Sequence, residues 1–187
     1  ASHPRAQRVE QIVLRHADAI WRTARDLGVL PRDLEDVVQE VLVVCVRRVD
    51  DIDPARERAF LLATTARVVA NWRRGRRRRP AEPFESVDDL GSEGLEPHSR
   101  PTGPAEALER KRELALVQGA LDEMTEPQRV AFTLFELEEL SAREIAEQLG
   151  VSEPVVFARV QRARAVFQRY LSRARLACDP ADKKRPG

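Results

Sequence analysis

A short run of acids and amides has the composition of either a metal site or a protein-docking surface. If Asp33-Leu-Glu-Asp-Val-Val-Gln-Glu-Val is helical, Asp36, Gln39 and Glu40 share one face, opposite an apolar face made of Leu34, Val37, Val38, Val41 and Cys45. Clustered carboxylates bind Mg²⁺ in nucleases, but no histidine or second acidic cluster completes such a site. Acids at a helix start are also favoured by the helix dipole. We therefore interpret this face as a docking surface, with Asp33 as the predicted N-cap.

A second group of residues has the chemistry needed to bind nucleic acid. Six of the seven residues 73–79 are arginine, which is typical of a phosphate-binding segment, although such a run also serves solubility or localisation. A helix over 56–74 would gather an aromatic ring, a hydroxyl, an amide and guanidinium groups on one face: Phe60, Thr64, Arg67, Asn71 and Arg74. Such a face can stack on and hydrogen-bond unpaired bases. Phe60 fits a core position equally well.

The segment 140–164 has the pattern of a helix-turn-helix. Ser141-x-x-Glu144 is a capping box, Gly150 suits a left-handed turn, and Ser152 is placed to cap a second helix that opens with Glu153 and Pro154. The positions where the two helices must pack are apolar: Ile145, Leu149, Val151, Val156 and Val160. The second helix is therefore predicted to enter the major groove of DNA.

The outer face of that second helix is basic. Arg159, Arg162, Arg169 and Arg173 share one side of it, and no acid occurs from Pro154 to Ala177. Ala158 and Gln161 lie between these arginines and Phe157 on the helical wheel. A solvated basic face is the alternative, but its coupling to a capped helix-turn-helix favours DNA contact.

The elements that must position these residues are all predicted to be helices. Apolar residues recur at helical spacing from Val9 to Leu27, where Gly28 ends the pattern, and Pro31 restarts it. Thr125-x-x-Gln128 is a second capping box. No stretch alternates with period two for long enough to form a strand. The sequence thus predicts an all-α fold of two small helical domains joined by a flexible linker.

Charge and composition set the domain boundaries. Residues 1–80 hold 17 Arg and 11 acids, residues 81–104 hold one Arg and six acids with several Pro and Gly, and residues 105–187 hold 14 basic and 14 acidic residues. We therefore expect domains over 1–80 and 105–177, a linker over 81–104 and a disordered tail over 178–187. No apolar run reaches the length of a membrane span, and two cysteines form no framework, which favours the cytoplasm.

These motifs together resemble a known family. The segment 33–41 resembles the region-two signature of bacterial sigma factors, usually written D-A-E-D-L-V-Q-E-V, and residues 124–132 and 140–164 are similar to region four. Two such regions with a linker and nothing else match the extracytoplasmic-function (ECF) type. The resemblance covers most of residues 8–175. It departs from the family at 154–157, where Pro-Val-Val-Phe replaces a turn that commonly reads G-T-V and a basic residue, so the family's usual minus-35 sequence is not carried over to this chain.

The resemblance implies roles for particular residues. The acidic helix would dock on the clamp coiled coil of core RNA polymerase through Asp33, Asp36, Gln39 and Glu40. The next helix and the loop 50–56 would melt and capture the minus-10 element, with Arg73 joining Phe60, Thr64, Arg67, Asn71 and Arg74. Region four would bind the minus-35 element through Arg143, Phe157, Ala158, Arg159, Gln161 and Arg162.

The function implied is that of a cytoplasmic, nucleoid-associated promoter-specificity subunit, not an enzyme. It would use no metal or cofactor, would not insert in a membrane, and would be restrained by an anti-sigma factor. A stand-alone helix-turn-helix repressor or activator is the alternative, and a metal-dependent nuclease is a third class. A sensing role of Cys178 stays open, although a lone cysteine is usually inert.

Overall fold

The computed structural model describes residues 4–77 and 103–178, and every regular element in these two ranges is helical. The prediction of an all-α fold is confirmed. The predicted linker and tail lie outside the described residues, except that Gly103 precedes α4, Pro104 begins α4 (Pro104–Asp122), and Cys178 ends α7 (Glu153–Cys178).

The first half of the chain is a three-helix unit. It consists of α1 (Pro4–Asp26), α2 (Pro31–Arg48), two 3₁₀ turns (Val49–Asp51 and Pro54–Arg56) and α3 (Glu57–Arg77). Gly28, with φ of +85°, ends the α1 segment as expected. The prediction that Asp33 caps α2 was wrong, because α2 starts three residues earlier: Leu30 is the N-cap, Pro31 takes the first helical position, and Asp33 lies in the first turn.

The core of this half explains the positions of α2 and α3. The predicted apolar face of α2 is buried along its whole length: Leu34, Val37, Val38, Val41 and Cys45. This face packs in one cluster with residues of α1 and α3, such as Ile20 and Leu61. At the start of α3, the buried Glu57 lies with Oε1 2.8 Å from Nε2 of His16, which ties α3 to α1. The acidic face of α2 is thereby left pointing outward.

The second half is formed by α4, α5 (Glu126–Phe132), a π-helical turn (Thr133–Leu137), α6 (Ala142–Leu149) and α7. Both predicted capping boxes are present, at Thr125–Gln128 and Ser141–Glu144. Gly150 adopts the predicted left-handed conformation, with φ of +68°. The two capping boxes and the left-handed glycine predicted for this half are therefore confirmed.

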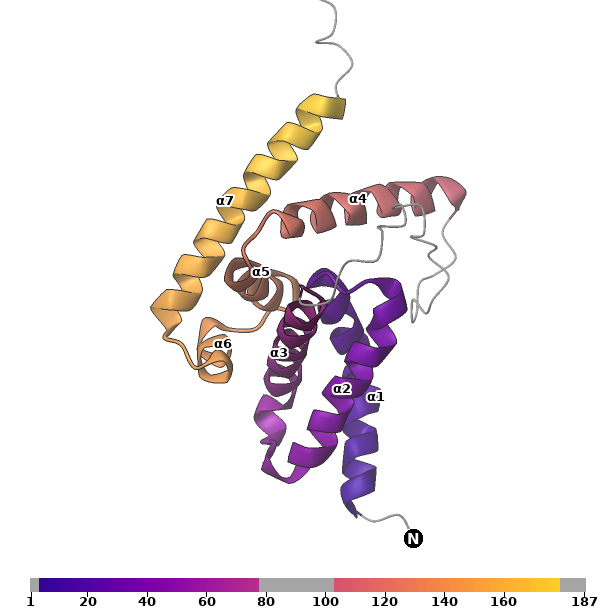
Figure 1. The fold of residues 1–187 in the computed structure, drawn as a ribbon, viewed down its shortest axis with the longest axis vertical. Coiled ribbons are helices and arrows are strands. Elements are labelled where there is room, and N and C mark those ends of the chain that lie inside the picture. The colour runs from indigo at the N-terminus through magenta and orange to yellow at the C-terminus, as the bar shows by residue number, and fades with distance from the viewer. Residues whose placement is uncertain (1–3, 78–102, 179–187) are drawn as a thin grey trace, which may run out of the picture.

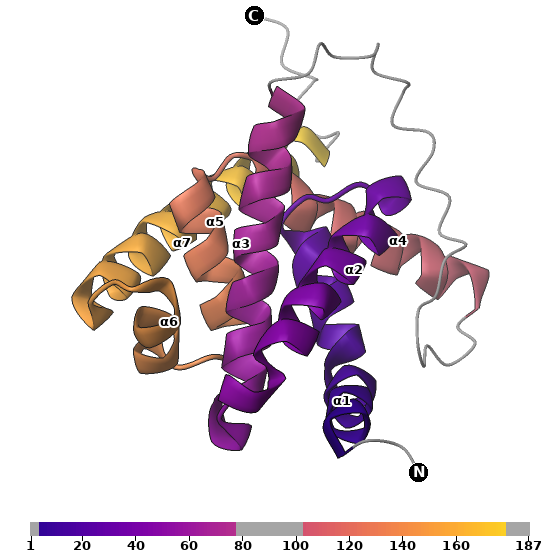
Figure 2. The ribbon, with the colours of Figure 1, turned by 60° about the horizontal axis from the view of Figure 1, so that its bottom comes forward.

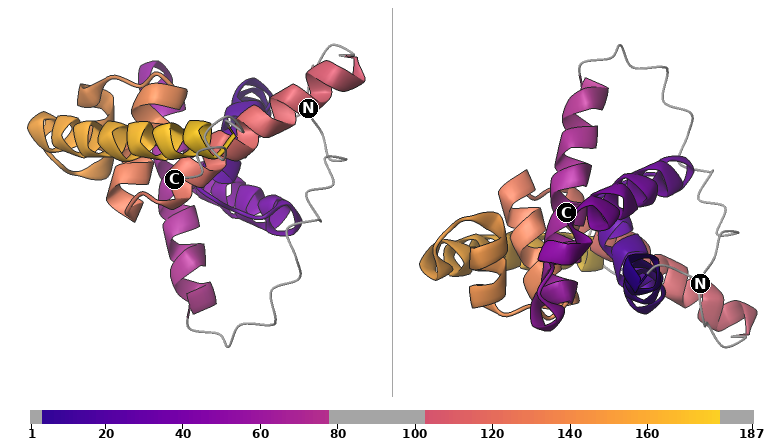
Figure 3. Two further views of the ribbon diagram at one scale, coloured as in Figure 1. Left: turned by 90° about the horizontal axis from the view of Figure 1, so that it is seen from above. Right: turned by 90° about the horizontal axis from the view of Figure 1, so that it is seen from below.

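The two halves pack on each other through α3. Figure 2 shows α3 between α1 and α2 on one side and α5 and α6 on the other. One hydrophobic cluster combines Ala59 and Leu62 of α3 with Ile145 of α6 and Val156 of α7. α7 runs along α5 and α6, and the end of α4 packs on it in a cluster that joins Leu121 to Ala163 and Val166. Away from this contact, α4 and α7 extend in different directions (Figure 1 and Figure 3).

Candidate nucleic-acid interface

The helix-turn-helix is built by caps and by a small core. Glu144 N donates to Ser141 Oγ at 3.2 Å, and Ser141 N donates to Glu144 Oε2 at 2.9 Å, so each residue satisfies an unpaired donor of the other. Ile145, Val156 and Val160 are at most 1% exposed and join α6 to α7. This packing fixes which side of α7 faces outward.

The outward side of α7 carries most of the predicted minus-35 residues. Ala158, Gln161 and Arg162 are exposed, and Arg159 is half-buried. Phe157 is 47% exposed, and its ring meets the ring of Phe135 edge-on, with the centroids 6.0 Å apart. Phe157 is therefore not part of the buried face that holds α7 to α6. These residues thus form one surface over the first three turns of α7.

Arg143 lies on α6 instead of α7. Its side chain is largely exposed, with Nε 3.2 Å from Oε1 of Glu147, one helical turn along α6. Glu147 is also paired with Arg56, which precedes α3 and belongs to the predicted minus-10 loop. The carboxylate of Glu147 therefore links a predicted region-four residue to the first half of the chain.

The acidic face of α2 is presented as predicted. Asp36, Gln39 and Glu40 are exposed, and Gln39 Nε2 lies 3.5 Å from Glu35 Oε1. Asp33 is only half-exposed, and its Oδ2 lies 3.8 Å from Nε of Arg32. Three of the four predicted docking residues are thus open to a partner in this arrangement.

The predicted minus-10 face of α3 is only partly accessible. Asn71 and Arg74 are exposed and hydrogen-bonded to each other. Phe60 is partly buried against the core of the first half, whereas Thr64 is 4% exposed. The exposed position that the helical wheel predicted for Thr64 was wrong for this arrangement, because α3 is covered on several sides by neighbouring helices.

Arg67 is exposed but already has a hydrogen-bond acceptor in the second half. Its guanidinium donates to the backbone carbonyl of Gln148 in the last turn of α6. Carbonyls of a last turn lack helical donors and carry the negative end of the helix dipole, so they suit a guanidinium. A nucleic-acid phosphate would have to compete with this contact for Arg67.

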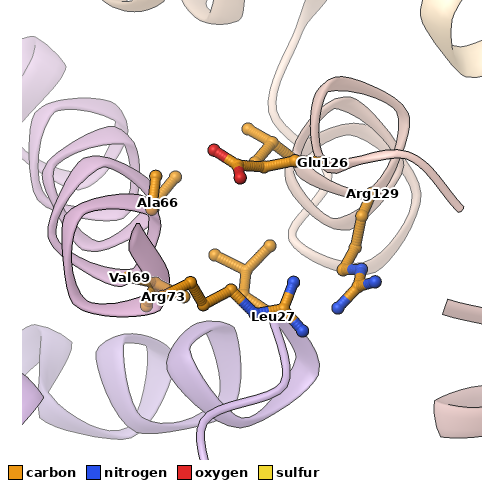
Figure 4. Close-up of a pocket in the computed structure, with 8 residues that line it drawn as sticks. Leu27, Ala66, Val69, Arg73, Glu126 and Arg129 are labelled. Carbon is orange, nitrogen blue, oxygen red and sulfur yellow. The ribbon is translucent and has the colours of Figure 1, made fainter. Parts of the chain in front are cut away.

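Arg73 lies against the junction of the halves. A Cβ added at Gly28 would come within 2.7 Å of Arg73 Nη2 and 3.1 Å of Arg129 Nη1, so the absence of a side chain there makes room for both guanidinium groups. Figure 4 shows these two arginines at a pocket that Leu27, Ala66, Val69 and Glu126 also line. Arg73 is therefore half-buried, unlike the exposed Arg74.

A buried carboxylate forms an ion-pair contact between the two halves that the sequence did not predict. Glu138, in the second half, is 1% exposed, and its carboxylate is paired with Arg58 (Nη2–Oε2, 2.7 Å) and with Arg22 (Nε–Oε1, 3.5 Å). Burial raises the pKa of Glu138, and the two arginines oppose that shift. Nothing in the local pattern distinguishes Glu138 from its acidic neighbours Glu136 and Glu139, which is why sequence reasoning missed it.

Two other carboxyl groups are perturbed by their surroundings. Burial raises the pKa of Asp26 at the end of α1, and Arg25 partly offsets this. The hydrogen bonds from the Ser141 side chain and backbone lower the pKa of Glu144. Asp26 is the last residue of α1, and Glu144 lies in the first turn of α6, so both shifts occur at helix ends.

The described ranges lack the features of two other classes of protein. Residues 4–77 and 103–178 contain no group of three or more His, Cys, Asp or Glu placed to hold a metal ion. In the same ranges, no helix combines the length and apolar character needed to cross a membrane.

Comparison with known proteins places these surfaces in a family. Residues 12–79 match the model of sigma-70 region 2, and residues 114–166 match that of sigma-70, region 4. The RNA polymerase sigma factor CnrH of Cupriavidus metallidurans is 33% identical over 157 residues, which are 83% of this chain and 82% of CnrH. The ECF RNA polymerase sigma factor SigE of Mycolicibacterium smegmatis is 31% identical over 166 residues, 88% of this chain and 62% of SigE. The chain belongs to the ECF sigma factors.

Solved structures give this sigma factor the same fold. CnrH in complex with the cytosolic domain of CnrY matches with a TM-score of 0.62 and 26% identity, covering 90% of this chain and 94% of CnrH. The sigma factor RpoE, in complex with the anti-sigma factor NepR from Bartonella quintana, matches with a TM-score of 0.66 and 22% identity, covering 87% of this chain and 96% of RpoE. The resemblance noted in the sequence is confirmed.

Proposed function

We propose that this ECF sigma factor binds core RNA polymerase and directs it to promoters with defined minus-10 and minus-35 elements, without catalysing a reaction itself. One observation carries the proposal: the same chain presents an exposed acid and amide face on α2 and an exposed arginine-bearing face on the second helix of a helix-turn-helix. A DNA-binding protein that acts alone has no use for the first of these faces. A specificity subunit needs both.

Each half of the chain has a proposed task. Residues 1–80 form the polymerase-docking and minus-10 domain, residues 81–104 the linker, residues 105–177 the minus-35 domain and residues 178–187 a tail. Docking is assigned to Asp33, Asp36, Gln39 and Glu40. Minus-10 capture is assigned to the loop 50–56 with Phe60, Arg67, Asn71, Arg73 and Arg74, and to Thr64 once the helices that cover α3 have separated from it. Minus-35 binding is assigned to Arg143, Phe157, Ala158, Arg159, Gln161 and Arg162.

Control by a protein inhibitor is part of the proposal. RpoE, which shares this fold, is described in complex with the anti-sigma factor NepR, and CnrH in complex with the cytosolic domain of CnrY. A partner of this kind would hold the chain away from polymerase. The proposed location is the cytoplasm, at the nucleoid, where polymerase and promoters are found.

Run-off transcription tests the function. The chain is added to core RNA polymerase on a library of promoter fragments, and the start sites are mapped. The expected result is transcription from a subset of fragments that share two elements, and only when the chain is present. Binding to palindromic duplexes without polymerase, together with no transcription, would instead identify a stand-alone helix-turn-helix regulator.

A further inference from the structure

The first turns of α7 expose apolar side chains where a DNA-reading helix meets the bases. Val155 is 39% exposed and Phe157 47%, and Pro154 and Ala158 are also exposed. The intervening Val156, and Val160 one turn later, are almost fully buried and make the contacts that hold α7 to α6. Packing of the helix-turn-helix therefore uses Val156 and Val160, and the exposed apolar residues remain available to a ligand.

The arrangement of these residues on α7 matches a reading surface. Successive residues are turned by about 100° around the helix axis. With Val156 and Val160 pointing inward, Ala158 and Arg162 point outward, and Val155 and Phe157 lie on the two flanks. Phe157 is held by its edge-on contact with Phe135, and the guanidinium carbon of Arg164 lies 5.9 Å from the Phe135 ring centroid. Arg164 is in turn paired with Glu136, so the aromatic flank has a defined orientation.

Charge identifies duplex DNA as the occupant of this surface. The apolar residues share the first three turns of α7 with Arg159 and Arg162. Glu153 opens the helix, and no acid occurs from Pro154 to Ala177. An apolar protein-docking patch has no need of a basic stretch that continues along the same helix, whereas a phosphate-lined groove favours one. The patch is therefore continuous with the proposed minus-35 interface.

Thymine is the base that matches exposed apolar side chains. In the major groove it alone among the four bases presents a C5-methyl group, and apolar side chains recognise it by contact, whereas arginine recognises guanine by two hydrogen bonds. We propose that Val155, Phe157 and Ala158 read thymine methyl groups, so that the minus-35 element of this sigma factor combines thymines with the guanines contacted by arginine. This inference rests on the proposed role of α7 in minus-35 binding.

The test removes only the methyl group. The full chain, alone and bound to core polymerase, is first used to select duplexes from a randomised library. The selected duplexes are resynthesised with uracil in place of one thymine at a time. The affinity of the protein for each duplex is then measured by fluorescence anisotropy. At one or more positions, wild-type protein should lose about fourfold in affinity, the value of burying one methyl-sized apolar group. Val155→Ser and Phe157→Ser, which leave no methyl group or ring at these positions, should each bind thymine and uracil duplexes equally at the position facing the altered side chain.

A matched control lies on the same helix. Leu176, near the far end of α7, is 76% exposed, so Leu176→Ser removes an exposed apolar side chain away from the reading turns and should keep the thymine preference. Equal affinity of the wild-type protein for thymine and uracil duplexes would overturn the inference and leave minus-35 binding by α7 intact. Loss of transcription in Phe157→Ser with an unchanged thymine preference would overturn it in favour of a protein partner. Failure to select any sequence would overturn both the inference and the proposed role of α7.

Discussion

The guanidinium of Arg58 donates to the carboxylate of Glu138 across the contact between the two halves, with Nη2 2.7 Å from Oε2. The same guanidinium also donates to the backbone carbonyl of Glu138. Because Glu138 is 1% exposed whereas Arg58 is over one-third exposed, the carboxylate depends on arginines of the other half for its compensation. This pair is one of several polar links that place α3 against α6 and bring Arg67 to the end of α6.

Breaking this pair should weaken the closed arrangement. Arg58→Ala leaves the buried carboxylate with Arg22 alone, and we expect a loss of about 1–3 kcal/mol in the free energy of unfolding, less than for a fully buried pair because Arg58 is partly solvated. Urea denaturation measures the loss, and hydrogen exchange should show faster opening at α6. Arg47→Ala, an exposed arginine of α2, is the control. Equal stability of the Arg58 and Arg47 variants would show that the pair contributes nothing.

The contact should also depend on pH through Glu138. Since burial raises its pKa above the ordinary 4.5, the folded state binds the proton more tightly than the unfolded state. Its contribution to stability is therefore greatest below 4.5 and declines as pH rises from 4.5 through the raised pKa. Asp26, also raised, acts in the same direction, whereas Glu144, lowered, acts in the opposite one. The difference between the pH–stability profiles of the wild type and Glu138→Gln isolates the contribution of Glu138. A flat difference profile would contradict the prediction.

Docking on polymerase should depend on the acidic face of α2. Asp36→Arg combined with Gln39→Ala replaces an attractive contact by a like charge and should abolish co-purification with core polymerase. Both residues are exposed, so far-UV circular dichroism should stay unchanged. Glu10→Arg, the same type of charge reversal on the exposed surface of α1, should bind normally. Retained binding by the double variant would remove the docking assignment.

Base recognition by α7 should depend on Arg162. Arg162→Ala should weaken binding to the minus-35 duplex by about 1–3 kcal/mol and relax the preference at a single base pair, because a bidentate contact to guanine is lost. Binding to a panel of single-position variants of the element measures this. A uniform loss across the panel would mean that Arg162 contacts a phosphate.

The features that the sequence determined by itself are local ones. The capping boxes, the left-handed Gly150 and the buried face of α2 follow from residue types at fixed spacing along one segment, since helical periodicity and cap chemistry act within a few residues. For the same reason the motifs of regions two and four were recognisable, and with them the family.

Only the tertiary structure determined which residues of the two halves contact each other and which become buried between helices. A helical wheel gives the direction of Thr64 and Arg67 around α3, but it does not say which faces of α3 other helices cover. Arg58 and Glu138 are separated by 80 positions, and no periodicity connects residues that far apart. Their pairing and the contact of Arg67 with α6 arise because the apolar faces of α3 and α6 pack in one core, which brings their polar borders together.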